Sequence, residues 1–257
     1  MTKYPVVLIH GMMLKDFRFY RAFGNVCGQL REMGVKAYVL NHDGVGTIAH
    51  NAAQIKRAIQ SILKEQGVEK VNLIAHSKGG LDARYMISAL GMEDQVASLT
   101  TLSTPHHGSK MSRTLLKMPD WMARFIAFWT NLVYRIFGDD APDLLTVARE
   151  LTDTYLLEFN ESVLNSEKVL YQSYSSGICN RRMIAMFVPH KLSVYCEGGR
   201  TDGMVSVESS KWGTYRGEIG GEVNHLEMVS FYGNKKRKEQ VASFYRGLVK
   251  ELAEEGF

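Results

Sequence analysis

The sequence predicts an α/β fold, in which a mostly parallel central sheet is flanked by helices. Short apolar runs rich in β-branched residues alternate with helical patterns from residue 6 to residue 102, which is typical of parallel strands joined by helical crossovers. Hydrophobic residues make up 45% of the chain and charged residues 23%, as in ordinary globular proteins. The length of 257 residues suits one domain with a large core. We therefore expect a single domain over residues 1–257.

The expected strands and helices follow in chain order. Residues 6–9 are wholly apolar, as in a buried parallel strand. A helical pattern over about 19–33 ends at Gly34, a residue type favoured as a C-terminal cap. Apolar positions within 48–66 recur every three or four residues and predict a long amphipathic helix. The same criteria predict strands at 36–40, 71–75, 96–102, 169–174 and 192–196, and helices at 78–90, 121–137 and 239–254.

The stretch 75–80, Ala-His-Ser-Lys-Gly-Gly, lies between an expected strand and an expected helix. A serine at such a junction is typical of a nucleophile elbow. The turn must be sharp to lift the hydroxyl clear of the sheet, so it tolerates only small residues two positions before and after, here Ala75 and Gly79. Ser77 is therefore the predicted nucleophile. The alternative is a serine that merely caps an ordinary helix.

A nucleophilic serine needs a base and an acid that orients the base. His225 lies late in the chain, before the last helix, where a loop of the sheet can present it, and we predict it as the base. Asp202 is the only aspartate after Asp153 and follows the expected strand at 192–196, so it is the predicted acid. Simple surface-loop and turn roles remain the alternatives, with Glu197 and Glu227 as substitute acids.

An oxyanion hole needs two backbone N–H donors. The first is predicted at Lys78, which follows the serine and opens a helix whose first N–H groups are free. The second is predicted at Met12, because Gly11 lets the backbone turn after the first strand. A simple strand-ending turn is the alternative for this loop.

The alternation of strands and helices breaks after residue 108, and a helical insertion is expected over residues 109–165. Its apolar helix carries Arg124, Asn131 and Arg135 on one narrow stripe, and it is too short and too charged to span a membrane. We expect this insertion to be a lid over the active site, with a plain packing helix as the alternative. The tentative substrate-lining residues are Met13, His106, Trp121, Phe125, Phe128 and Trp129.

Five motifs occur together: His-Gly-Met at 10–12, the elbow at 75–84, Leu-Ser-Thr-Pro-His-His-Gly-Ser at 102–109, Thr-Asp-Gly at 201–203 and Asn-His-Leu at 224–226. With them, nearly the whole chain resembles the bacterial triacylglycerol lipases of the α/β-hydrolase fold. The resemblance implies a carboxylic-ester hydrolase with Ser77, Asp202 and His225 as its triad and with Met12 and Lys78 as oxyanion donors. A single glycine before the oxyanion donor implies, by the same resemblance, a preference for medium or long acyl chains.

The expected function is therefore a serine lipase or esterase that cleaves glycerides through an acyl-enzyme. An acyltransferase or thioesterase with the same triad is the alternative within enzymes, and a non-catalytic lipid carrier is the alternative outside them. We expect a small-molecule ester or lipid substrate and no required cofactor. Several relatives in the resembled family bind a structural calcium through an aspartate two residues after the catalytic histidine. Glu227 holds that position here and is the only calcium candidate, so we expect no metal.

The net charge and the cysteine content limit which partners and which cellular compartment we expect. The net charge of +4 does not indicate nucleic-acid binding and would not repel anionic lipid surfaces, so transient contact with a lipid interface is expected. The basic run 235–238 is interpreted as a solvated face, with lipid head groups as the alternative. Three cysteines and no recognisable signal peptide or membrane span predict a reduced, cytoplasmic protein, or a secreted one if a leader was removed.

Overall fold

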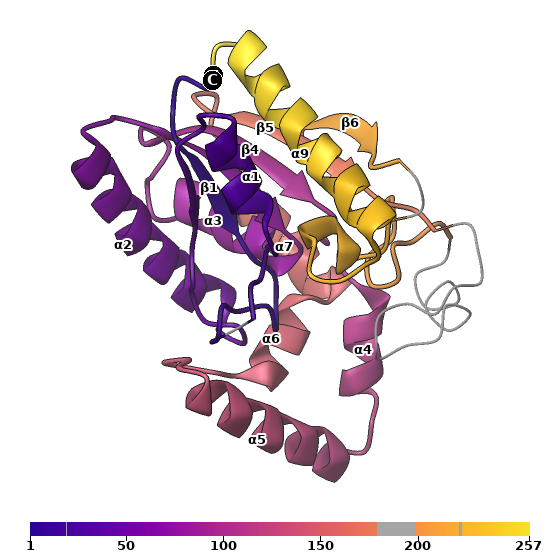
Figure 1. The fold of residues 1–257 in the computed structure, drawn as a ribbon. Helices are drawn as coiled ribbons and strands as arrows, with labels where there is room; N and C mark the ends of the chain where they lie inside the picture. Colours follow the sequence, from indigo (N-terminus) through magenta and orange to yellow (C-terminus); the bar gives the residue numbers. More distant parts are fainter. Residues whose placement is uncertain (19, 179–198, 221–222) are drawn as a thin grey trace.

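The structure is a computed structural model that describes residues 1–18, 20–178, 199–220 and 223–257. Its centre is a parallel sheet with the strand order β2-β1-β3-β4-β5-β6 (Figure 1). The non-sequential order places β1 and β3 side by side inside the sheet, each with a neighbouring strand on both edges. The strands are β1 (Val6–Ile9), β2 (Ala37–Val39), β3 (Val71–His76), β4 (Val96–Leu102), β5 (Leu170–Ser175) and β6 (Thr214–Glu218).

Helices cover both faces of this sheet. Because side chains alternate along a strand, Val6 and Leu8 face one core with α1 and α9, whereas Val7 and Ile9 face a second core with α2 and α3. Figure 1 shows α1 and α9 lying across one face. The predicted α/β fold is thus confirmed. These four helices are α1 (Val26–Glu32), α2 (Ile48–Gln66), α3 (Lys78–Ser88) and α9 (Lys235–Glu254).

The insertion between β4 and β5 contains four helices joined by loops. It contains α4 (Lys110–Leu116), α5 (Asp120–Ile136), α6 (Leu144–Glu150) and α7 (Asp153–Ser162). Figure 1 shows α5 at one end of the molecule, away from the sheet. Within the described ranges, no helix combines the length and the hydrophobicity needed to cross a bilayer. The lid role of this insertion and the single-domain boundaries stay predictions.

Three elements differ from the sequence prediction. The first helix begins at Val26 rather than near residue 19, because Gly24 takes a left-handed φ of +48° and a Cβ there would lie 2.4 Å from the carbonyl oxygen of Ser230. The edge strand β6 was not predicted. The last helix begins at Lys235, four residues earlier than expected, where the Asn234 side chain accepts a hydrogen bond from the Arg237 N–H. The expected strand at 192–196 lies outside the described residues.

Candidate active site

Ser77 lies at the junction of β3 and α3 in a strained backbone conformation. Its φ of +53° and ψ of −133° are rare for a residue with a side chain, and strain of this kind gathers at functional sites. The surrounding glycines allow the turn. A Cβ on Gly11 would lie 2.6 Å from the Ser77 Cβ, and one on Gly79 would lie 2.4 Å from the His10 carbonyl oxygen. Ser77 makes no side-chain capping bond to α3, so the simple N-cap alternative lacks its hydrogen bond.

Asp202 and His225 form a buried hydrogen-bonded pair. The His225 Nδ1 lies 2.6 Å from the Asp202 Oδ2, and their side chains are 3% and 0% exposed. The other carboxylate oxygen of Asp202 accepts the N–H groups of Met204 and Val205, each at 2.9 Å. The carboxylate is thereby fixed, and it holds the imidazole with Nε2 directed away from it.

His76 joins this pair to the elbow, and sequence reasoning did not assign it a role. Its ring centroid lies 4.4 Å from that of His225, and its Nε2 lies 2.9 Å from the His225 carbonyl oxygen. Burial, followed by the nearby His225, holds the pKa of His76 well below its usual value, so His76 is neutral. Since Ser77 is the next residue, the strand end brings all three predicted triad residues to one edge of the sheet. Among the described residues the Ser77 hydroxyl has no hydrogen-bond partner.

The two predicted oxyanion donors follow the neighbouring strands β1 and β3. The N–H of Met12 has no acceptor within the described part of the chain, while Met13 beside it donates to the Gly44 carbonyl at 2.8 Å. Lys78 is the first residue of α3, where the N–H groups have no acceptor inside the helix. Both N–H groups are therefore free to bind an anion, as the prediction requires.

A buried ion pair lies directly behind the elbow. The Lys78 Nζ donates to the Asp82 Oδ1 at 2.6 Å, and both side chains are 1% exposed. Asn51 donates to the second oxygen of Asp82 at 3.0 Å. Burial raises the pKa of Asp82 to about 6, and Lys78 opposes that rise. Burial also raises the pKa of Glu150 on α6 to about 7. The four-residue spacing of Lys78 and Asp82 is the one sequence signal for this pair.

The residues predicted to line the substrate site are dispersed. Met13 is half-buried and packs against Val45 and Leu144. His106 is fully buried, with its Nε2 3.0 Å from Thr101 Oγ1 and its ring stacked on Trp212. Its Nδ1 lies 3.3 Å from the Arg84 Nη1, and Arg84 also donates to Asn160 on α7. The aromatic residues predicted on the insertion point to solvent from α5; they are Trp121, Phe125, Phe128 and Trp129.

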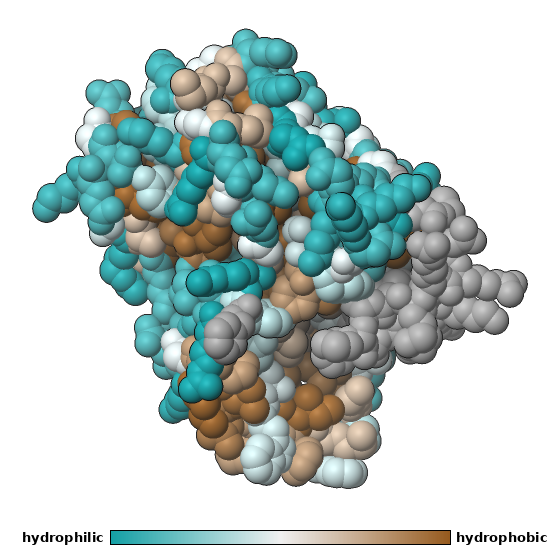
Figure 2. Space-filling view, in the orientation of Figure 1, coloured by the Kyte–Doolittle hydropathy of each residue, from teal (hydrophilic) through white to brown (hydrophobic). Residues whose placement is uncertain are grey.

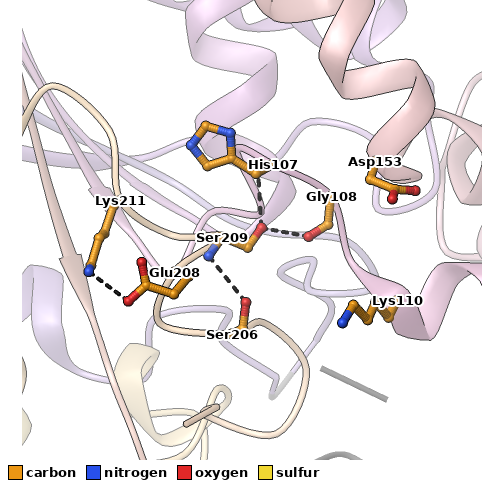
Figure 3. A pocket seen from close by; sticks show the side chains of 8 residues that line it. All are labelled: His107, Gly108, Lys110, Asp153, Ser206, Glu208, Ser209 and Lys211. Atoms are coloured by element: carbon orange, nitrogen blue, oxygen red, sulfur yellow. Dashed lines mark hydrogen bonds and ion pairs between the residues drawn. The ribbon is translucent and has the colours of Figure 1, made fainter. Parts of the chain in front are cut away.

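A polar cavity of about 580 Å³ lies beside the loop that follows Asp202 (Figure 3). Figure 3 shows Ser209 at its centre, bonded to Gly108, His107 and Ser206, with an ion pair between Lys211 and Glu208 at its edge. The remaining lining residues are Lys110 and Asp153. Charged walls of both signs do not suit an acyl chain, so we do not assign this cavity to the predicted reaction.

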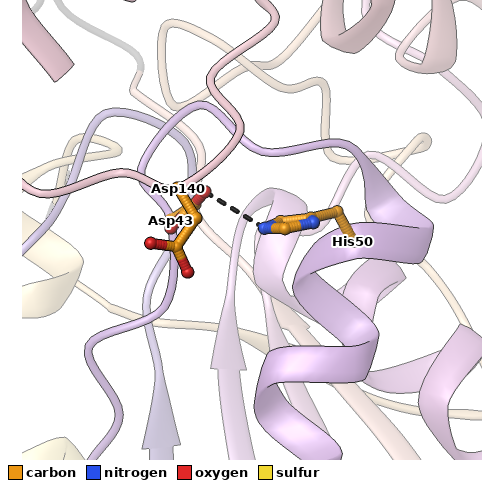
Figure 4. A group of neighbouring side chains, drawn as sticks. All are labelled: Asp43, His50 and Asp140. Carbon is orange, nitrogen blue, oxygen red and sulfur yellow. Dashed lines mark ion pairs between the residues drawn. The ribbon is translucent and has the colours of Figure 1, made fainter. Parts of the chain in front are cut away.

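One group of side chains in the described ranges has the spacing of metal ligands: Asp43, His50 and Asp140, whose ligand atoms lie within 4.8 Å of one another (Figure 4). Gln54 already bridges the two carboxylates, donating to Asp43 at 3.0 Å and to Asp140 at 3.1 Å. These hydrogen bonds connect α2 to Asp43 and to the segment that follows α5. The calcium candidate Glu227 accepts the Asn224 N–H at 3.0 Å and lies outside this group, and calcium binding stays untested.

The chain is similar to known lipases in sequence and in fold. Triacylglycerol lipase 2 of Saccharomyces cerevisiae is 30% identical over 257 residues, which is 89% of this chain and 72% of that protein. The chain belongs to the lipase and esterase family of α/β-hydrolases. It is a carboxylic-ester hydrolase by that membership. Residues 5–148 also match the family model described as palmitoyl protein thioesterase, so this lipase-family chain belongs to that sequence family as well.

Other relatives are bacterial. The triacylglycerol lipase of Pseudarthrobacter phenanthrenivorans is 31% identical over 180 residues, 63% of this chain and 54% of that protein, so the chain spans about half its length. The structure of the mature lipase BlEst2 of Bacillus licheniformis matches with a TM-score of 0.70 at 18% identity. The match covers 96% of this chain and 92% of the BlEst2 chain. The structure of the metagenomic carboxyl esterase MGS0156 matches with a TM-score of 0.75 at 16% identity. The match covers 98% of this chain and 76% of the esterase chain. These two structures support the α/β-hydrolase fold.

Proposed function

We propose that this lipase-family protein hydrolyses acyl glycerides through an acyl-enzyme on Ser77. The observation that carries the proposal is the buried His225–Asp202 bond of 2.6 Å, which lies at the same sheet edge as the strained turn at Ser77. A histidine held in one tautomer by a carboxylate and a serine on a sharp turn together form the catalytic unit of serine hydrolases.

In the proposed reaction the Nε2 of His225 takes the proton of the Ser77 hydroxyl as its oxygen bonds to the ester carbonyl carbon. The carbonyl oxygen becomes an oxyanion and accepts the N–H groups of Met12 and Lys78. The intermediate then expels the alcohol, which leaves with the proton held by His225. Water attacks the acyl-enzyme by the same route and gives the acid and the free serine. Asp202 keeps the Nδ1 of His225 protonated and stabilises the charged ring.

The glyceride substrate is proposed from two supports. The relatives named above are triacylglycerol lipases, and the oxyanion loop has one glycine before Met12, the arrangement tied by resemblance to medium or long acyl chains. A series of p-nitrophenyl esters from acetyl to palmitoyl tests this part. We expect kcat/KM to peak at eight carbons or longer, given about 0.8 kcal/mol for each buried CH₂. A peak at acetyl would instead assign a short-chain esterase.

The catalytic part is tested by Ser77→Ala. We expect the variant to fold like the parent and to hydrolyse aryl esters at the background rate, since the nucleophile is lost. Ser61→Ala is the matched control, because Ser61 is an exposed serine on α2 and its loss should leave kcat unchanged. Hydrolysis by Ser77→Ala at the parental rate would contradict the proposal.

A thioesterase using the same residues is a second candidate, because residues 5–148 match the palmitoyl protein thioesterase family. An acyl-enzyme forms from an ester or a thioester by the same attack, so the site chemistry does not separate them. Giving the protein a glyceride, an acyl-CoA and an alcohol acceptor in parallel does separate them. Faster acid release from acyl-CoA would favour the thioesterase, and transfer to the alcohol would favour an acyltransferase.

We also propose that the helical insertion borders the active site as a lid. Its support is the contact between α5 and the oxyanion loop: the Tyr134 hydroxyl donates to the Met13 carbonyl at 2.7 Å, and its ring lies against Gly44. Activity against an emulsified ester should then rise sharply above the solubility limit. Smooth saturation through that limit would contradict opening at an interface.

A further inference from the structure

Helix α5 buries only small side chains against the rest of the protein. Its buried residues are Ala123 and Ala127, whereas Trp121 is 71% exposed and Ile136 is 69% exposed. Figure 2 shows apolar side chains lying open at the end of the molecule that α5 occupies. Since a helix is usually held in place by burial of its largest apolar groups, polar contacts carry a larger share of the attachment here.

A buried carboxylate, that of Asp139, makes three of these polar contacts from the segment between α5 and α6. Its side chain is 0% exposed. Its Oδ1 accepts the Lys15 Nζ at 2.8 Å and the Gly44 N–H at 3.0 Å, and its Oδ2 accepts the Val45 N–H at 2.9 Å. A carboxylate stays charged in the interior when it is paired and hydrogen-bonded in this way. These three donors all belong to loops outside the insertion.

The donors bound by Asp139 lie on the two loops that hold the proposed oxyanion donor, Met12. Lys15 is three residues after Met12, on the loop that follows β1. Gly44 is on the loop that follows β2, and its carbonyl accepts the Met13 N–H at 2.8 Å. The Asp139 carboxylate therefore connects the loop after β1 to the loop after β2, beside the bond that joins Met13 to Gly44.

Met13 depends on such support because its backbone is strained. Its φ of +61° lies in the left-handed region, which a residue with a side chain keeps only where its neighbours hold it. Both of its backbone groups are bound, since its N–H donates to Gly44 and its carbonyl accepts the Tyr134 hydroxyl at 2.7 Å. A rigid peptide plane joins Met12 to Met13, so release of Met13 would also move the Met12 N–H.

We propose that Asp139 is a positioning residue for the oxyanion donor at Met12. Asp139 touches no reacting atom; it holds the two loops together so that the Met12 N–H keeps the direction that an oxyanion requires. The inference rests on the proposed function, in which that N–H binds the oxyanion. Attachment of the insertion does not depend on Asp139 alone, since the Asp143 N–H also donates to the Val45 carbonyl at 2.9 Å.

The test is the rate at which a fluorophosphonate labels Ser77, measured beside kcat and KM for a soluble p-nitrophenyl ester. The P=O oxygen of the probe occupies the place of the oxyanion, so the labelling rate reports on the two N–H donors. The final extent of labelling counts the folded sites. A purely structural residue would change the extent of labelling, whereas a positioning residue changes the rate.

Asp139→Asn keeps the size of the side chain but replaces one accepting oxygen by an NH₂ group, so at least one donor loses its acceptor. We expect the labelling rate and kcat to fall about tenfold, with KM within about threefold and one label per chain at the end. Asp139→Ala removes all three bonds and should lower both rates about 10²-fold. The double variant Lys15→Met with Asp139→Asn leaves no unpaired buried charge, so it keeps the test valid if a single variant unfolds. It should show at least the loss of Asp139→Asn.

Asp120→Asn is the matched control. It removes an aspartate that pairs with Arg124 on the outside of the same insertion, where the two side chains are 79% and 72% exposed. This variant should be labelled and should turn over like the parent. A parental labelling rate in folded Asp139→Asn, beside a parent labelled at Ser77, would overturn this inference alone.

A fall in activity matched by an equal fall in the extent of labelling would also overturn it, because that result assigns Asp139 a purely structural role. A folded parent without a label on Ser77 would overturn the proposed function, and this inference with it.

Discussion

The Nδ1 of His225 lies 2.6 Å from the Oδ2 of Asp202, and both side chains are buried. The main chains are joined too, since the His225 N–H donates to the Asp202 carbonyl at 3.1 Å. The imidazole is therefore held by its neighbour through side chain and backbone together. In the proposed mechanism, this relationship is what lets Asp202 orient His225 and leaves the Nε2 of His225 as the basic nitrogen.

Asp202→Asn tests that orienting role. The amide keeps the size of the carboxylate but allows the wrong tautomer of His225, so we expect kcat to fall about 10³–10⁴-fold with little change in stability. The measurement is kcat for a soluble aryl ester beside the free energy of unfolding. Asp94→Asn, at an exposed aspartate, is the control and should change neither quantity much. A fall of less than tenfold at position 202 would contradict the role.

We expect the buried charges of Lys78 and Asp82 to be energetically coupled, so that losing one charge destabilises the fold more than losing both. Asp82→Asn leaves the buried Lys78 ammonium without its partner, so we expect a loss of about 3–5 kcal/mol in the free energy of unfolding. The double variant Lys78→Met with Asp82→Asn removes both charges and should recover most of that loss. Urea unfolding of the three proteins measures it. Equal destabilisation of the single and the double variant would show that the two charges are not coupled.

Glu150 should make the stability depend on pH. Its pKa is raised to about 7 by burial from an ordinary value of 4.5, so between pH 4.5 and 7 the folded state binds more protons than the unfolded one. Stability should therefore fall as the pH rises through this window, by at most about 3 kcal/mol. Asp82 adds to the same trend between pH 3.8 and 6.

Urea unfolding at pH 5 and pH 7.5 measures this trend. Glu150→Gln should flatten it, whereas Glu158→Gln, at an exposed position on α7, should leave it as in the parent. If Glu150→Gln keeps the full pH dependence, the burial of this carboxyl does not control stability.

Gly79→Ala should distort the elbow. The new methyl group would lie 2.4 Å from the His10 carbonyl oxygen, so β1 and α3 must move apart. We expect kcat to fall at least tenfold, because the proposed donors at Met12 and Lys78 lie on these two elements. Gly247→Ala on α9 meets no atom within 4 Å and should stabilise the helix by up to about 1 kcal/mol. Parental kcat in Gly79→Ala would contradict the packing argument.

The sequence predicted the sheet and the sharp turn at Ser77 well because both depend on local patterns. The strands at β1, β3 and β4 are continuous apolar runs, and the turn at Ser77 needs small neighbours that are visible in the sequence. The edge strand β6 escaped prediction because its residues alternate between exposed and half-buried without an apolar run. The start of α1 depends on contact with Ser230, two hundred residues away, and no local signal reveals it.

The interpretation of α5 shows a second limit. Periodicity identified an apolar helix with a narrow polar stripe, but it could not tell which face turns to the protein. The structure places the small residues Ala123 and Ala127 inward and the aromatic residues outward. The burial of Lys78 against Asp82 was likewise invisible, because a lysine after the nucleophile would normally be taken as exposed.

The most direct test of the account is covalent labelling with a fluorophosphonate followed by peptide mass spectrometry. The phosphorus should bond to the hydroxyl oxygen of Ser77 with loss of fluoride, one label per chain, and the label should be lost in His225→Ala because the base is gone. Labelling confined to Ser77 in the parent is the predicted result. A label on another serine, or an unlabelled and fully folded parent protein, would contradict the central claim.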